Sequence, residues 1–393
     1  MKKDICIVGA SAAGLYAAHL LARAGARVCV LEAGAQLNPA ARTLIVTPQL
    51  RDLLGPLAER CIVNLIHRFE LFADGKAIEI QLESPDLVVE RTAIIHHLAQ
   101  QVRSSGGEIC FGRRFVSLHE ENSHLRVVHQ DSSGRCAEQK ADVVVGADGA
   151  CSKVAKEAGW PPPLTVPLIQ VIVEPPEDLD PTTTRVWFAP EDTPYFYWLI
   201  PESRTKAALG LIAEDGSRGL DALKRFAARH GLRPQKYQAA RIPLYTGWTP
   251  IHRRLGGGDV YLVGDAVAHV KVTTVGGIVT GFWGAQAVAE AILNGKHSQS
   301  LAKLKGELNR HLLLRKALHG FSEKNYSHLF DLLTPRTRRC LTRYHRDQTS
   351  NLLWNLCLRQ PRLFFTGIQS LLANGSFPAS PSSKSLDNNG KDL

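Results

Sequence analysis

The sequence predicts an α/β protein in which a Rossmann-like domain is interleaved with an antiparallel β-sheet domain and followed by C-terminal helices. Three observations predict this class. A strand, a glycine-rich turn, a helix and a second strand follow one another over residues 4–32. Short strands alternate with turns that contain Pro over 165–245, and an Asp-Gly turn at 73–76 joins two strands within 68–90. After residue 300 the pattern is helical.

Local patterns justify each element in chain order. Ile5–Val8 is a short apolar run typical of a buried parallel strand, Leu15–Ala24 has helical periodicity, and Arg27–Leu31 is the second strand. The other expected elements are a helix at Ala93–Arg103, strands at 108–118, 124–129, Ala141–Val145, Leu168–Val173, Thr184–Phe188, Tyr195–Ile200 and Ala207–Ile212, a helix at Leu220–His230, a strand at 259–263 and a helix at Gly276–Leu293.

This order of elements predicts domains built from separate stretches of the chain. Residues 1–67, 91–160 and 250–300 are assigned to the Rossmann-like domain, and 68–90 and 161–249 to the antiparallel sheet. Residues 301–375 are expected to be a helical region. Residues 376–393 are rich in Ser, Pro, Asn, Gly and Lys and are expected to be a disordered tail.

Composition and charge exclude several classes of protein. The chain has 393 residues, 44% hydrophobic and 21% charged, which excludes a wholly disordered chain or a fibre. No apolar run approaches the ~20 residues of a membrane-spanning helix. Eight scattered cysteines without a CxxC pair suggest reduced, mostly buried thiols, no metal site and a cytoplasmic location.

The net charge of +10 is concentrated at the C-terminal end. Residues 301–393 hold 15 Lys and Arg against 6 Asp and Glu, and the densest basic stretch is 335–346. Apolar stretches at 352–354, 363–365 and 368–372 follow it, so the region is suited to peripheral contact with an anionic membrane. Solvated arginines beside the protein's own core are the alternative. No nucleic-acid-binding motif is present, so nucleic acid is not an expected partner.

The glycine turn of the first unit predicts dinucleotide binding. Gly9-Ala-Ser11-Ala12-Ala13-Gly14 fits the G-x-G-x-x-G pattern with Ser in place of the middle Gly. Small residues are needed there because backbone N–H groups must approach a pyrophosphate at a helix N-terminus. Glu32 stands 23 residues after Gly9, where a carboxylate would accept hydrogen bonds from ribose hydroxyls.

Two further motifs indicate which dinucleotide. One buried strand ends in Ala-Asp148-Gly149, and another ends in Gly264-Asp265. With the glycine turn, they resemble the ordered motifs of the FAD-dependent superfamily with the p-hydroxybenzoate hydroxylase fold. Arg42 and Arg91 stand where that superfamily carries arginines near the flavin. The resemblance implies FAD as cofactor, with Asp265 accepting a ribityl hydroxyl and the following loop facing the flavin.

Within this superfamily the chain is similar to the geranylgeranyl reductase branch. The stretch after Asp265 contains Lys271, Thr273-Thr274 and Gly276-Gly277-Ile278, and a second match is Phe196-Tyr197-Trp198-Leu-Ile-Pro201. The resemblance implies reduction of isoprenoid C=C bonds by hydride transfer from reduced flavin. It also implies that NAD(P)H or a small electron carrier is the reductant. Phe196, Tyr197, Trp198 and Pro201 would wall an apolar cavity for an isoprenoid or lipid substrate, with Phe196 and Trp198 on one strand face.

Proton delivery and the departures from the family pattern give further expectations. His269 and Lys271 are candidate catalytic residues that supply or relay a proton, with phosphate or surface contact as their alternative. Val272 replaces a usual Pro and Val275 a usual Gly, and residues 38–47 lack the Cys of some relatives. A β-branched Val resists φ > 0, so the loop at Val275 is expected to be either locally different or strained.

Three other functions remain open at the level of the sequence. An FAD-dependent monooxygenase would use NAD(P)H and O2. A flavin halogenase is suggested by the similarity of Phe196-x-Trp198-x-Ile200-Pro201 to the WxWxIP strand of that group, although residues 68–85 offer only Lys76 as a catalytic lysine. A flavin-binding protein without turnover is the third.

Overall fold

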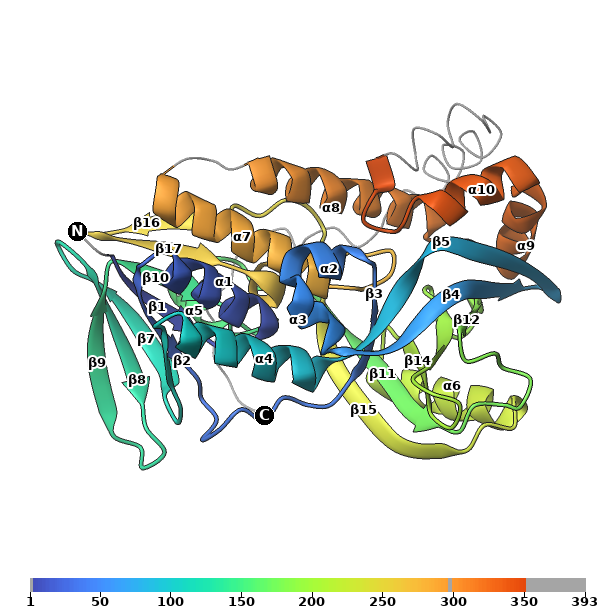
Figure 1. Cartoon of the computed structure of the whole chain (residues 1–393), viewed down its shortest axis with the longest axis horizontal. Coiled ribbons are helices and arrows are strands. Elements are labelled where there is room, and N and C mark those ends of the chain that lie inside the picture. The colour runs from blue at the N-terminus through green and yellow to red at the C-terminus, as the bar shows by residue number, and fades with distance from the viewer. Residues whose placement is uncertain (1–2, 296–298, 351–393) are drawn as a thin grey trace, which may run out of the picture.

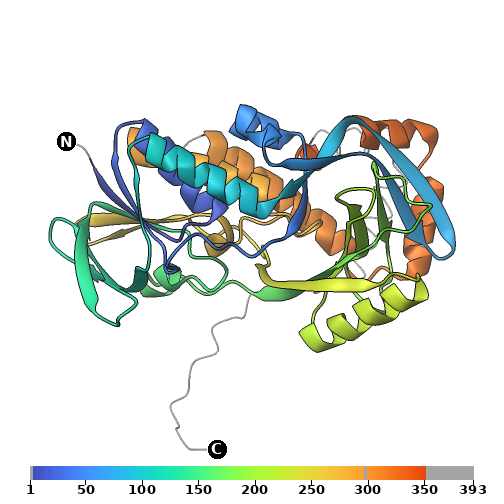
Figure 2. The same cartoon turned by 60° about the horizontal axis from the view of Figure 1, so that its bottom comes forward.

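The computed structural model describes residues 3–295 and 299–350 (Figures 1 and 2). Its first sheet is mainly parallel and has the strand order β16-β17-β10-β1-β2-β6. Only the edge pair β16–β17 is antiparallel in this sheet. The strands are β1 (Asp4–Val8), β2 (Arg27–Leu31), β6 (Glu108–Cys110), β10 (Val143–Gly146), β16 (His252–Leu255) and β17 (Gly258–Leu262). The central strands are buried on both faces, as their unbroken apolar runs predict.

Helices and a small sheet cover this parallel sheet. In Figure 2 the helices α1 (Ala12–Arg23), α4 (Arg91–Ser104) and α7 (Ile278–Asn294) lie above it. The three strands β7 (Arg114–Glu120), β8 (Leu125–Gln130) and β9 (Cys136–Ala141) lie below it. β9 and β16 were not expected from the sequence. β9 is mostly exposed, and β16 has only four residues.

The second sheet has eight strands in the order β15-β11-β14-β13-β12-β4-β5-β3. They are β3 (Thr43–Val46), β4 (Ile62–Ala73), β5 (Lys76–Glu90), β11 (Thr165–Val173), β12 (Thr183–Trp187), β13 (Tyr197–Pro201), β14 (Ala207–Ile212) and β15 (Pro234–Pro243). β3 and β15 were not expected, and β4 starts at Ile62, so the expected domain boundary after residue 67 falls inside a strand. Helix α6 (Gly216–Arg229) packs on one face of this sheet.

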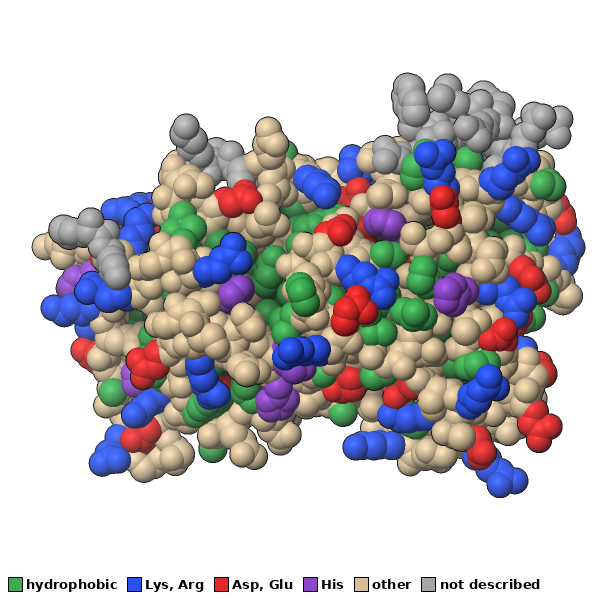
Figure 3. Space-filling view, viewed as in Figure 1, with side chains coloured by type: hydrophobic (Ala, Val, Ile, Leu, Met, Phe, Trp, Pro, Cys, Tyr) green, Lys and Arg blue, Asp and Glu red, His purple; other side chains and the backbone are tan. Residues whose placement is uncertain are grey.

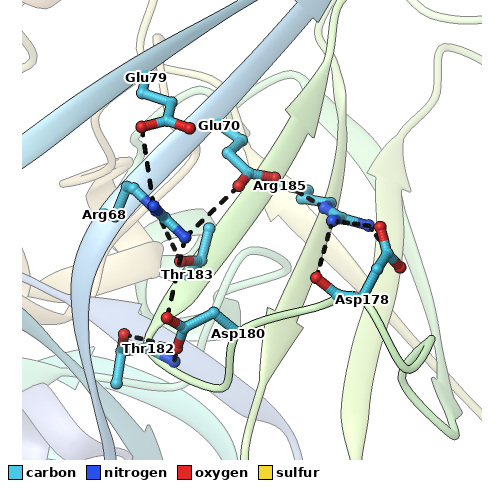
Figure 4. Close-up of polar contacts among 8 residues, drawn as sticks. All are labelled: Arg68, Glu70, Glu79, Asp178, Asp180, Thr182, Thr183 and Arg185. Carbon is cyan, nitrogen blue, oxygen red and sulfur yellow. Dashed lines mark hydrogen bonds and ion pairs between the residues drawn. The ribbon is translucent and has the colours of Figure 1, made fainter.

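One pairing in the second sheet is parallel, contrary to the purely antiparallel sheet expected. β12 runs parallel to β4, with Arg185 opposite Glu70. Arg185 binds Glu70 at 2.8 Å and Asp178 at 2.7 Å, and Arg68 extends the ion-pair network (Figure 4). Arg185 and Glu70 are largely buried, so removing either one would leave an uncompensated buried charge where β4 meets β12.

The remaining elements are short helices and the C-terminal helices across the top of Figure 1. They are α2 (Gln49–Leu54), α3 (Pro56–Glu59), α5 (Lys153–Glu157), the 3-10 helix η1 (Gly264–Val267), α8 (Gln299–Leu318), α9 (Glu323–Leu332) and α10 (Pro335–Arg343). No helix in the described ranges has the length and apolarity needed to cross a membrane. The expected tail at 376–393 and the apolar stretches at 352–354, 363–365 and 368–372 lie outside the described residues.

The described cysteines form no disulfide, but fewer of them are buried than expected. Cys6, Cys61 and Cys340 are buried, whereas the two at 29 and 110 are half-buried and those at 136 and 151 are exposed.

Candidate active site

The glycine turn after β1 brings backbone close to backbone. Gly9 has φ 102°, and a Cβ added there would lie 2.6 Å from the carbonyl oxygen of Ala147. A Cβ on Gly14 would lie 2.5 Å from the carbonyl oxygen of Gly9. Ser11 is the N-cap of helix α1, and its Oγ accepts from the N–H of Gly14 at 3.2 Å. The turn therefore leaves the helix N-terminus open for an anion, with the Ser11 hydroxyl hydrogen still available to donate.

Two acidic residues border the cleft above this turn. The Glu32 carboxylate accepts from the N–H groups of Ala10 at 3.0 Å and Gly34 at 2.8 Å. It lines the cleft together with Asp148 and Gly149. Both oxygens of Asp148 accept bonds from the start of α5, including the hydroxyl of Ser152 at 2.5 Å. Asp148 thus holds the turn in shape, and two backbone N–H groups hold the Glu32 carboxylate at the cleft wall.

Asp265, Arg42, Arg91 and Lys271 are the charged residues that line the adjoining pocket. Burial raises the pKa of Asp265, and the guanidinium groups of Arg42 and Arg91 oppose that rise. Burial also lowers the pKa of Arg42, and the neighbouring charge of Arg91 adds to the effect. The Arg42 Nε is buried and has no hydrogen-bond partner within the protein. An unpaired buried donor of this kind favours a bound polar group in the pocket.

The loop after Asp265 closes the pocket with a strained residue. Val275 has φ 53°, so the loop is strained, as expected for Val at this position. Helix α7 begins directly afterwards, and its N-cap Gly277 offers no side-chain cap. A Cβ on Gly277 would lie 3.4 Å from Asp265 Oδ1. The first N–H groups of α7, at Ile278 and beyond, therefore lie at the pocket wall beside a compact glycine pair.

These parts form one continuous cleft that fits FAD. The ribose end and the flavin end share walls at Ser11, Arg91, Ala147 and Gly149. Most of the expected cofactor residues line one or both ends: Gly9, Ser11, Ala12, Ala13, Glu32, Arg42, Arg91, Asp148, Gly149, Gly264, Asp265, Gly276, Gly277 and Ile278. Gly14 does not line the cleft and serves the close packing of α1.

An apolar pocket adjoins the flavin end. The two share seven wall residues, namely Arg42, Leu44, Ile45, Leu168, Lys271, Val275 and Gly276. One wall of this pocket consists of Phe196, Trp198 and Ile200, from β13 and the residue before it. The rings of Phe196 and Trp198 meet edge to face with centroids 6.1 Å apart. Gly210 on β14 makes room for the indole, because a Cβ there would lie 2.5 Å from Trp198 Cζ2.

Two of the expected substrate residues do not line this pocket. Tyr197 alternates to the opposite sheet face, where its ring stacks on Phe226 of α6 at 4.0 Å. Its hydroxyl donates to Asp192 at 2.9 Å. Pro201 ends β13, and its carbonyl accepts from Asn64 at 2.9 Å. The expectation that these two residues form the substrate wall is therefore corrected.

The two expected proton carriers are placed very differently. The ring of His269 is buried against Gly284 and Trp248, outside the walls of the cleft and the apolar pocket. Burial lowers the pKa of His269 to about 3. Lys271 lines both the flavin end and the apolar pocket, and its Nζ donates to Asp347 at 2.5 Å. The structure therefore brings Lys271, but not His269, to the site.

Several wall residues were not expected from the sequence. Leu44 and Ile45 belong to β3, a strand of four residues, and the apolar run after Arg42 was the only signal for it. Arg346 reaches the apolar pocket from the segment after α10 and pairs with Asp86 at 2.6 Å. No local pattern indicates that contact.

Comparison with known proteins identifies the class of this site. The family described as "FAD binding domain" matches residues 2–301. The chain therefore belongs to that family, and it is an FAD-dependent oxidoreductase.

Relatives and a solved structure indicate which branch of FAD-dependent enzymes the chain resembles. The geranylgeranyl diphosphate reductase of Rhodobacter capsulatus is 28% identical over 345 residues, which cover 83% of this chain and 85% of that protein. The digeranylgeranylglycerophospholipid reductase of Methanoculleus marisnigri is 28% identical over 321 residues, 75% of this chain and 79% of that protein. The structure resembles that of a geranylgeranyl bacteriochlorophyll reductase-like protein from Thermoplasma acidophilum. Its TM-score is 0.76 at 18% identity, covering 94% of this chain and 99% of that one. The resemblance to the geranylgeranyl reductase branch is thus confirmed.

Proposed function

We propose that this chain reduces C=C bonds of an isoprenoid substrate, with NAD(P)H or a small electron carrier as reductant. The observation that carries the proposal is the apolar pocket directly against the flavin end of the cleft. When bound and reduced, FAD supplies the hydride. The names of the relatives, which are reductases of geranylgeranyl compounds, support this class of substrate.

The chain's own contribution is to position the double bond. An alkene without a neighbouring carbonyl offers no charge to bind, so apolar walls must fix it beside the flavin end. Phe196 and Trp198 form one wall, and Leu44 and Ile45 lie where the two pockets meet. Trp198 is 9% exposed and packed over Gly210, so its indole is a rigid surface for an isoprenoid chain.

The second carbon of the double bond needs a proton, and Lys271 is our candidate for carrying it. It is the lysine in the walls shared by the two pockets among the residues that the structure describes. Its Nζ donates to the fully buried carboxylate of Asp347. A relay from Nζ to the substrate carbon would be general acid catalysis by a positioned side chain.

The test is a single turnover without oxygen. The purified holoprotein is reduced under argon and mixed with a geranylgeranyl lipid, and the visible flavin band is followed together with the product mass. We expect reoxidation of the flavin and a gain of two hydrogens per reduced bond. Trp198→Leu should weaken substrate binding about tenfold, whereas Tyr197→Phe, on the opposite sheet face, should leave it unchanged.

The same experiment separates the other functions. A reduced flavin that is reoxidised only when O2 enters, with hydroxylation of the substrate, would replace the proposal with a monooxygenase. The halogenase alternative has little support, since Lys76 lies at the exposed β4–β5 turn and pairs with Asp331 at 2.7 Å. A protein that binds FAD but is reduced by no donor would be the flavoprotein without turnover.

We also propose peripheral contact of the basic region with an anionic membrane that holds the substrate. Lys and Arg side chains gather over α9 and α10 at the upper right of Figure 3. Arg339 and Arg343 of α10 are exposed. Co-sedimentation with vesicles that contain anionic lipid should fall with added salt and with Arg339→Glu/Arg343→Glu. Equal sedimentation of both proteins would contradict this contact.

A further inference from the structure

The residues after α10 bind the loop that closes the flavin end. We call residues 344–349 the C-terminal segment and residues 271–276 the flavin loop. The side chain of Asp347 is fully buried, and one of its oxygens accepts from Lys271 Nζ at 2.5 Å. The other oxygen accepts from the hydroxyl of Thr47. The carboxylate therefore has a partner on each side and is fixed in place.

Lys271 passes this constraint to the flavin loop. Its carbonyl accepts from the N–H of Val275 at 2.7 Å, and its own N–H donates to the carbonyl of Gly276 at 3.2 Å. The side-chain stem runs beneath Gly276, since a Cβ there would lie 3.6 Å from Lys271 Cε. Gly276 in turn lines the flavin end. A movement of the ammonium group would thus move the pocket wall.

A second anchor ties the middle of the loop to the same segment. Thr273 Oγ1 lies 2.5 Å from Nδ1 of His311 on α8, and His311 Nε2 lies 3.0 Å from the carbonyl oxygen of Arg346. The His311 ring thus bridges the Thr273 hydroxyl and the backbone carbonyl of Arg346. The loop is therefore held to residues 346–347 at two points.

The strain at Val275 explains why such anchors are needed. A β-branched residue at φ 53° persists only where the surroundings hold it there. We infer that Asp347 is a positioning residue that keeps the flavin loop, through Lys271, in the strained shape that binds FAD. The inference concerns cofactor binding and does not depend on which substrate is reduced.

The test is the rate of FAD release from the full-length holoprotein, followed by the rise in flavin fluorescence on dilution. Asp347→Asn should release FAD at least tenfold faster than the unchanged protein. Asp331→Asn, which removes the acid of the exposed Lys76–Asp331 pair, is the matched control and should stay within twofold. In a Val275→Gly background, Asp347→Asn should speed FAD release less than threefold, because glycine adopts φ 53° without an anchor.

Two results would overturn the inference. One is a folded Asp347→Asn protein that releases FAD at the normal rate. The other is an equal acceleration of FAD release by Asp347→Asn in the unchanged and the Val275→Gly backgrounds, which is what a merely structural role for Asp347 would give. If Asp347→Asn does not fold, Thr47→Val leaves both charges in place and carries the test. Thr47→Val should speed FAD release about threefold in the unchanged protein and have no effect in the Val275→Gly background. The same acceleration of FAD release in both backgrounds would likewise overturn the inference.

Discussion

Replacing Gly9 with Ala tests whether close backbone approach at the first turn builds the cofactor cleft. Gly9 has φ 102°, and an added Cβ would lie 2.6 Å from the Ala147 oxygen and 2.9 Å from its carbonyl carbon. Gly25 is the matched control, because it has φ 88° and no atom within 4 Å of an added Cβ. The two substitutions share the backbone strain and differ in the collision.

The structure gives the size of each effect. Positive φ costs an L residue about 1–2 kcal/mol, and the lower entropy of the unfolded chain returns about 0.4–1 kcal/mol. Gly25→Ala should therefore cost about 1 kcal/mol. Gly9→Ala adds overpacking of about 1–3 kcal/mol, because the atoms that it meets are backbone and cannot rotate away. Its total cost should be about 2–4 kcal/mol.

The assay combines urea unfolding with FAD titration of both variants. Relief of the collision would shift the turn at Ala147, Asp148 and Gly149, which lines the cleft. We therefore expect FAD affinity to fall at least tenfold in Gly9→Ala and to stay unchanged in Gly25→Ala, since about 1.4 kcal/mol corresponds to tenfold. Equal stability loss in the two variants, or normal FAD binding by Gly9→Ala, would refute the reasoning.

Three further predictions concern charges and thiols. Burial raises the pKa of Glu307, but hydrogen bonds from His311, Thr349 and Arg310 outweigh it and bring the pKa to about 2 from 4.5. About 3 kcal/mol of stability should thus be present above pH 4.5 and be lost as the pH falls towards 2, and unfolding of Glu307→Gln across this range should lack that loss. Arg42→Met removes one of two guanidiniums that lower the pKa of Asp265, so the rise in the FAD release rate on lowering the pH should begin at a higher pH than in the unchanged protein. Burial raises the pKa of Cys6 to about 12, so peptide mapping after thiol labelling at neutral pH should find Cys136 and Cys151 modified well before Cys6; equal labelling would contradict the burial pattern.

Local chemistry explains what could be predicted from the sequence. The Gly9–Gly14 turn and the Gly264-Asp265 motif are short-range patterns, and each requires small residues where backbone approaches backbone. The strain at Val275 was also predictable, because a β-branched side chain disfavours φ > 0 in any fold. Strand alternation correctly placed Phe196 and Trp198 on one face.

Only the tertiary structure decided which face of the second sheet meets the flavin end. It also decided which residues distant in the sequence reach the site. Strand alternation puts Tyr197 on the face opposite Phe196 and Trp198, and the packing of α6 on the Tyr197 face leaves the other face to the pocket. Asp347 reaches Lys271 across 76 residues of sequence, Arg346 arrives with it, and no periodicity encodes such a contact. The sequence by itself thus determined the cofactor-binding turns and the strand faces, whose causes lie within a few residues. Long-range packing determined the substrate pocket and the anchors of the flavin loop, because their shape depends on how separate elements meet.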